Sequence, residues 1–114
     1  MLFVWYLTIA KKDAVMSPKN KRNKIEKRIE LNGSLCCWCC KHLEREEITV
    51  EHLIPKSHGG SNAFYNLYLA CKPCNQSRGN LLLPPKYSLQ SIGYLKLLEW
   101  VKMIQHLFGQ RLKE

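Results

Sequence analysis

The chain has 114 residues, a formal net charge of +9 and six cysteines. This length suits one modest domain with a limited core, and small domains of this kind often depend on a bound metal. The apolar stretch over residues 1–10 is about half the roughly 20 residues of a membrane span, so no membrane partner is expected. It also lacks the charged flank and cleavage site of a secretory signal, so we expect a reducing, cytoplasmic compartment rather than a disulfide framework.

Residues 1–16 form an apolar N-terminal segment that we interpret as a strand or a packing element, with Met16 as an alternative natural start. A helix is predicted next. Ser17 suits its N-cap and Pro18 its first turn, Ile25 and Ile29 supply a thin apolar stripe, and Gly33 follows its end.

The basic excess lies mainly beside this helix. Its cationic residues fall within ten positions and suit contact with a phosphate backbone; they are Lys19, Lys21, Arg22, Lys24, Lys27 and Arg28. A solvated helix face that only keeps the protein soluble is the alternative interpretation.

Residues 48–50 predict a short strand with Glu51 and His52 at its end, where Pro55 prevents a regular continuation. A second strand is predicted over residues 66–71. A short helix should begin at Asn75 and weaken or end at Gly79.

A Pro-Pro pair at residues 84–85 marks a boundary before a predicted amphipathic helix over residues 89–112. Its apolar residues recur at steps of three and four: Ile92, Leu95, Leu98, Val101, Ile104, Leu107 and Phe108. We therefore divide the chain into residues 1–16, a basic helix plus motif region over 17–83, and a helix over 84–114 that packs on or extends it. We expect Trp5, Trp38 and Trp100 to lie in the core.

Two C-x-x-C pairs predict a structural zinc site. Each pair presents two thiolates from one turn, and two pairs complete a tetrahedral shell. The cluster over residues 36–40 allows two registers; we favour Cys36 with Cys39, which places Cys40 at a turn position usually given to Gly. Cys71 and Cys74 supply the second pair. A Cys37 and Cys40 pair, a disulfide, or a ligand role for His42 are the alternatives.

Read together, the first cysteine pair, the Glu-His string over residues 50–60, Asn66-Leu67 and the string over residues 71–79 resemble an HNH endonuclease of the zinc-knuckle type. The resemblance implies an α+β fold, the small ββα-metal unit, here flanked by N- and C-terminal helices. It implies that His52 is the general base, that Glu51 and Asn75 hold a catalytic Mg²⁺ or Mn²⁺, and that Asn66 braces the hairpin loop. The expected DNA contacts are Lys21, Arg22, Lys24, Lys56 and Arg78.

The chain departs from the usual family pattern at two positions. Glu51 stands where Asp is commonest, and Asn75 stands where the last His often lies, which makes this an H-N-N variant. Because neighbouring residues of a strand point to opposite faces, a bend at the strand end is required to bring Glu51 and His52 to one phosphate.

Two functions from different classes follow. One is a metal-dependent endonuclease that hydrolyses DNA, and the other is a catalytically weak zinc-ribbon module that binds DNA or serves a larger nucleic-acid-processing complex. Retention of His52, Glu51 and Asn75 together favours the enzyme. The sequence assigns no oligomeric state.

Overall fold

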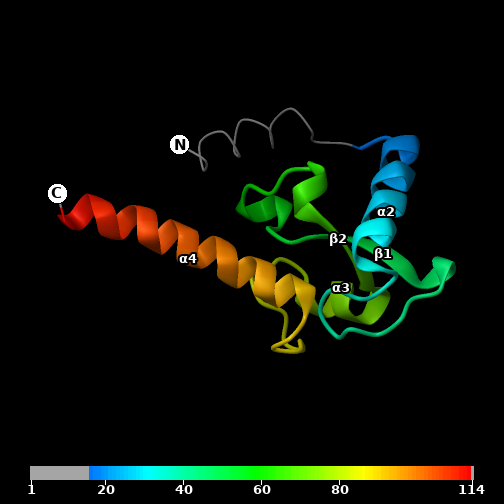
Figure 1. Cartoon of the computed structure of the whole chain (residues 1–114). Helices are drawn as coiled ribbons and strands as arrows, with labels where there is room; N and C mark the ends of the chain where they lie inside the picture. Colours follow the sequence, from blue (N-terminus) through cyan, green and yellow to red (C-terminus); the bar gives the residue numbers. More distant parts are fainter. Residues whose placement is uncertain (1–15, 114) are drawn as a thin grey trace.

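The computed structural model describes residues 16–113, with side chains as far as residue 107, so the interpretation of residues 1–10 and of Trp5 lies outside it. The expected α+β class is confirmed (Figure 1). In chain order the elements are α2 (Pro18–Asn32), three-residue 3₁₀ helix η1 (Arg45–Glu47), β1 (Ile48–His52), 3₁₀ helices η2 (Lys56–His58) and η3 (Phe64–Asn66), β2 (Leu67–Cys71), α3 (Lys72–Arg78) and α4 (Ile92–Lys113). Within the described part of the chain, none of these helices has the length and apolar character that crossing a membrane requires.

The basic helix α2 begins and ends at the residues that its sequence signals predict. The Ser17 side chain accepts a hydrogen bond of 3.2 Å from the Asn20 amide. At the other end, Gly33 has a φ of 79° and its amide donates to the Ile29 carbonyl, which ends the helix.

Arg28 fastens α2 to the hairpin. Its side chain is buried and donates to the carbonyls of Leu67 (3.0 Å) and Phe64 (2.9 Å). The guanidinium also lies over the rings of Phe64 and Tyr68, at 4.1 and 3.9 Å from the ring centroids. This member of the basic run is therefore a structural residue.

Strands β1 and β2 form an antiparallel hairpin, in which Ile48 lies opposite Cys71 and His52 lies opposite Leu67. Strand β1 includes Glu51 and His52, and the chain bends only after it, at Leu53 and Ile54, so the expected bend does not bring Glu51 and His52 together. Helix α3 follows β2 directly, beginning at residue 72 rather than at Asn75, because a proline in the first turn suits a helix start.

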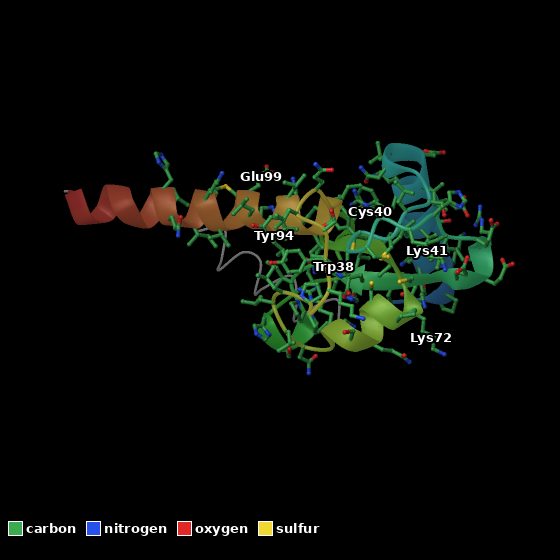
Figure 2. All side chains as sticks on the ribbon, turned by 90° about the horizontal axis from the view of Figure 1, so that it is seen from below. Trp38, Cys40, Lys41, Lys72, Tyr94 and Glu99 are labelled. Atoms are coloured by element: carbon green, nitrogen blue, oxygen red, sulfur yellow. The ribbon has the colours of Figure 1, made fainter. Side chains whose placement is uncertain are left out.

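The first turns of α4 pack against Trp38, which is fully buried at the centre of the core (Figure 2). A Cβ atom added at Gly93 would lie 2.7 Å from the Trp38 ring, so only glycine permits this contact. Leu97 is 8% exposed and Trp100 packs against the same core from its edge.

The rest of α4 extends away from the body of the protein (Figure 1). The apolar stripe predicted for this helix is exposed beyond Trp100. The side chains concerned are about half exposed: Val101 (47%), Ile104 (45%) and Leu107 (49%).

Candidate active site

Four cysteines from two turns come together at the base of the hairpin. The Sγ atoms of Cys36, Cys39, Cys71 and Cys74 all lie within 4.8 Å of one another, and those of Cys39 and Cys71 are 3.9 Å apart. Tetrahedral zinc with bonds of about 2.3 Å places its sulfur ligands roughly 3.8 Å apart. The cluster therefore fits a structural zinc ion, and the favoured register of the first pair is confirmed.

The first cysteine turn owes its shape to backbone hydrogen bonds around Cys40. The Cys36 amide donates to the Lys41 carbonyl (2.8 Å), and the Cys40 amide donates to the Cys36 carbonyl (3.0 Å). Cys40 has a φ of 67°, the left-handed conformation that explains why Gly is usual at this position. Cys37 points into the core, where burial raises the pKa of its thiol, and His42 is exposed and outside the cluster.

A cleft of about 500 Å³ opens on one face of β1. It is lined by Met16, Lys21, Ile48, Thr49, Val50, His52, Lys56 and Asn75. The structure thus brings His52 and Asn75 to one cavity, between a lysine from α2 and a lysine from η2. A base and an amide oxygen beside two cations form a site suited to a phosphate group.

The His52 ring is oriented by a residue that the sequence analysis did not single out. Its Nε2 atom lies 2.8 Å from Oδ1 of Asn62, which is buried in the loop between the strands. Burial lowers the pKa of His52, and the positive charges of Lys56, Arg78 and Lys24 lower it further, against the opposing effect of Asn62. A lowered pKa favours the neutral imidazole, which can accept a proton.

Asn75 is oriented from β1. Its Nδ2 atom donates to Oγ1 of Thr49 (2.9 Å) and to the Val50 carbonyl (3.1 Å), and Oγ1 of Thr49 in turn donates to the Ala70 carbonyl (2.7 Å). Both amide hydrogens are used, so the Oδ1 atom is the group that Asn75 can offer to a cation. Neither Thr49 nor Asn62 belongs to a recognisable sequence motif. Thr49 meets Asn75, and Asn62 meets His52, only once the two strands have paired.

Glu51 does not share this cleft. Its side chain is 7% exposed, its Oε2 atom accepts a hydrogen bond of 2.9 Å from Trp38 Nε1, and its Oε1 atom lies 3.4 Å from the Arg78 guanidinium. Burial raises the pKa of this carboxyl, while Trp38 and Arg78 act in the opposite direction. Because β1 is a regular strand, Glu51 and His52 point to opposite faces. Of the two expected metal ligands, Glu51 and Asn75, only Asn75 lies in the cleft.

Arg78 is likewise an internal residue. Its side chain is fully buried and donates to the carbonyls of His52 (2.7 Å), Leu81 (2.7 Å) and Leu82 (2.9 Å), with a further hydrogen bond to the Leu53 carbonyl. The guanidinium of Arg78 does not reach the surface, so the structure gives no support to its predicted phosphate contact. It ties the end of β1 to the loop after α3.

Asn66 closes the loop that follows β1. Its Oδ1 atom accepts from the Ile54 amide (2.9 Å), while its Nδ2 atom donates to the carbonyls of Ile54 (3.1 Å) and Ser61 (2.9 Å). Gly60 crosses so close to Ile54 that an added Cβ atom would lie 1.7 Å from the Ile54 carbonyl oxygen. These contacts fix the loop that carries Asn62.

Residues 36–85 match the family model described as HNH endonuclease. This segment belongs to the HNH endonuclease family. The match begins at the first zinc-site cysteine and includes both strands, α3 and the cleft residues His52 and Asn75. Comparison with the curated proteins gave no match.

Membership of the HNH family implies a nuclease that binds nucleic acid. The basic residues around the HNH domain fall into two groups, those that are exposed or line the cleft and one that binds the backbone of the loop beside His52. Lys21 and Lys56 line the cleft, and Arg22 is exposed on the same helix as Lys21. The Lys24 ammonium group donates to the backbone carbonyl of Asn62 at 2.5 Å, which joins α2 to the loop beside His52.

Proposed function

We propose that the HNH domain is a metal-dependent endonuclease that hydrolyses phosphodiester bonds in DNA, with His52 as its general base. The observation that carries this proposal is the shared cleft of His52 and Asn75, flanked by Lys21 and Lys56. Phosphodiester hydrolysis needs a base that is neutral near pH 7 and a hard cation beside the phosphate. The cleft offers a depressed-pKa imidazole and an amide oxygen for these two tasks.

Asn75 would hold the catalytic Mg²⁺ or Mn²⁺ through its Oδ1 atom. Such an ion supplies stabilisation of negative charge on the phosphate and on the leaving oxygen. Mg²⁺ commonly keeps several waters and takes few protein ligands together with phosphate oxygens, which suits a site with one amide oxygen. Glu51 is left out of the proposed ligand set because Trp38 and Arg78 occupy its carboxylate.

DNA would enter the cleft along the exposed side of α2. Lys21 and Lys56 line the cleft with His52 and would neutralise phosphates there, and the exposed Arg22 would extend this positive surface along the helix. Lys24 contributes through its hydrogen bond to Asn62 and through its positive charge near His52. Contacts of this kind read the backbone rather than the base sequence.

Incubation of the zinc-loaded protein with supercoiled plasmid tests the proposal. In Mg²⁺ or Mn²⁺ the protein is expected to convert the plasmid to nicked or linear form, and excess chelator should stop the reaction within the same preparation. Full zinc occupancy without any cleavage over a series of divalent metals would refute the enzyme.

The burial of Glu51 favours a second candidate, the catalytically weak zinc module that binds DNA. With one oxygen ligand in the cleft instead of two, such a module would hold a divalent ion poorly. It would bind labelled duplex DNA, with an affinity that falls as salt rises, and would leave the plasmid supercoiled in the assay above.

A reducing cytoplasm is the compartment that we propose for the protein. All six cysteines are free, and four of them form the zinc cluster. Thiolates that hold zinc must remain reduced, which a cytoplasmic environment provides.

A further inference from the structure

The side chain of Asn62 contacts the ring of His52. It lies in the loop between β1 and β2, is 2% exposed, and its Oδ1 atom is 2.8 Å from Nε2 of His52. A carbonyl oxygen can only accept a hydrogen bond. Nε2 of His52 therefore carries the hydrogen in this contact, and Nδ1 is the unprotonated nitrogen.

The loop around Asn62 is held from three sides. Asn66 binds the Ser61 carbonyl at 2.9 Å, Gly60 packs directly on the Ile54 carbonyl, and the Lys24 ammonium group binds the Asn62 carbonyl. The amide of Asn62 thus has a defined position before any substrate arrives. A fixed acceptor on one ring nitrogen sets both the tautomer and the rotation of the imidazole.

We propose that Asn62 is a positioning residue that fixes His52 as the Nε2–H tautomer, so that Nδ1 is the atom that acts as general base. This inference rests on the proposed nuclease function. In the reaction, Nδ1 takes one proton from a water molecule, and the oxygen of that water forms the new bond to phosphorus. The bond from phosphorus to the leaving oxygen breaks, its electron pair stays on that oxygen, and solvent protonates it.

Loss of the Asn62 amide would leave both neutral tautomers of His52 accessible and would allow its imidazole ring to rotate. Only the fraction with an unprotonated and correctly aimed Nδ1 could then react. Misplacement of a general base lowers the rate of the chemical step more than it lowers DNA affinity, because the ring does not bind the substrate in the ground state. Asn62→Asp keeps an oxygen acceptor at the same position and should retain the tautomer.

Long-range ¹H–¹⁵N correlation spectra of the zinc-loaded chain test the tautomer, without DNA or catalytic metal. Among the four histidines, the signals of His52 are assigned by their loss in His52→Ala. The wild-type protein and Asn62→Asp should show the Nε2–H form, and Asn62→Ala should show a mixture. An unchanged His52 tautomer in a folded Asn62→Ala protein would overturn the proposal, and so would an Nδ1–H form in the wild type.

Single-turnover cleavage of DNA by the same variants tests the consequence. Asn62→Ala should reduce the rate about 10- to 100-fold at saturating protein with DNA affinity unchanged within about 2-fold, whereas the exposed Asn80→Ala serves as the matched control and should react as wild type. An equal rate for Asn62→Ala would overturn the positioning role. An inactive wild type with the expected spectra would refute the nuclease instead, so the two failures are distinguishable.

Discussion

Arg78 shows how much of the site depends on a fully buried residue. One guanidinium holds the carbonyls at the end of β1 and those of the loop after α3, and it lies 4.9 Å from the centroid of the Trp38 ring. It also faces the buried carboxylate of Glu51. His52 owes its backbone position to this residue, since Arg78 binds the carbonyl of His52 itself.

Replacement of Arg78 by alanine should therefore act on stability. It leaves Glu51 buried without its cationic partner and frees four backbone carbonyls, so we expect the free energy of unfolding in urea to fall by about 3–5 kcal/mol. The exposed Arg22→Ala should change it by less than about 0.5 kcal/mol. Weaker DNA binding by Arg78→Ala at unchanged stability would instead indicate a phosphate contact.

The negative charge of Glu51 is buried between Trp38 and Arg78, and its role can be tested by removing that charge. In Glu51→Gln, the side-chain oxygen can still accept from Trp38, but the new amide group faces the Arg78 donors, so we expect a stability loss of about 1–3 kcal/mol. The Mn²⁺ concentration for half-maximal cleavage should not change. A rise of tenfold or more in that concentration, at wild-type stability, would show that Glu51 is a metal ligand.

The contrast between Glu51 and His52 explains what the sequence could predict at this scale. Because the two residues are adjacent in the motif, the sequence indicated that both belong to one site. In a paired strand, however, adjacent side chains point to opposite faces, and β1 remains regular through His52. The resemblance to a family is confirmed by the family model over residues 36–85. It carried no information on the hydrogen bonds to Trp38, Thr49 or Asn62, which depend on chain segments brought together by folding.

At the scale of elements, local signals predicted the helices and strands well. The N-cap Ser17, the Gly33 end and the strand over residues 48–50 follow from side-chain and backbone preferences that act over a few residues. The amphipathic pattern of α4 was less informative, because periodicity indicates an apolar face but not what covers it. The core ends near Trp100, and the apolar residues beyond it remain exposed.

Gly93 tests how α4 docks. In Gly93→Ala the new Cβ atom would lie 2.7 Å from the Trp38 ring and 2.9 Å from the Cys37 carbonyl oxygen. We expect overpacking to lower the free energy of unfolding by about 1–3 kcal/mol. Leu95→Ala, on the exposed side of the same helix, should cost less than about 0.5 kcal/mol. A stable Gly93→Ala protein would mean that α4 does not pack on Trp38 in solution.

The four-cysteine cluster fits a structural zinc ion, and we expect the fold to depend on that ion, because the described core is small and three of the four cysteines lie within it. The cluster joins the first cysteine turn to the end of β2 and the start of α3. It therefore holds the hairpin and the helix that carry His52 and Asn75. Metal binding and folding should be one event in a domain of this size.

Cys74→Ser tests this dependence. Wild-type protein should contain about one zinc per chain, and the variant should lose zinc together with its cooperative thermal transition. Cys40→Ser is the matched control, since Cys40 is exposed and outside the cluster, and it should retain the metal. A folded Cys74→Ser protein without zinc would contradict a structural role for the site.

We propose that His52 performs general base catalysis in the cleft that it shares with Asn75. The most direct measurement compares plasmid cleavage by wild type, His52→Ala and His58→Ala, at equal zinc content and equal stability, in Mg²⁺ and Mn²⁺. His58 is the matched control because it is exposed and does not line the cleft. We predict that His52→Ala loses cleavage by a factor of at least about 100 and that His58→Ala cleaves like wild type. Equal cleavage by His52→Ala and wild type would contradict the assignment.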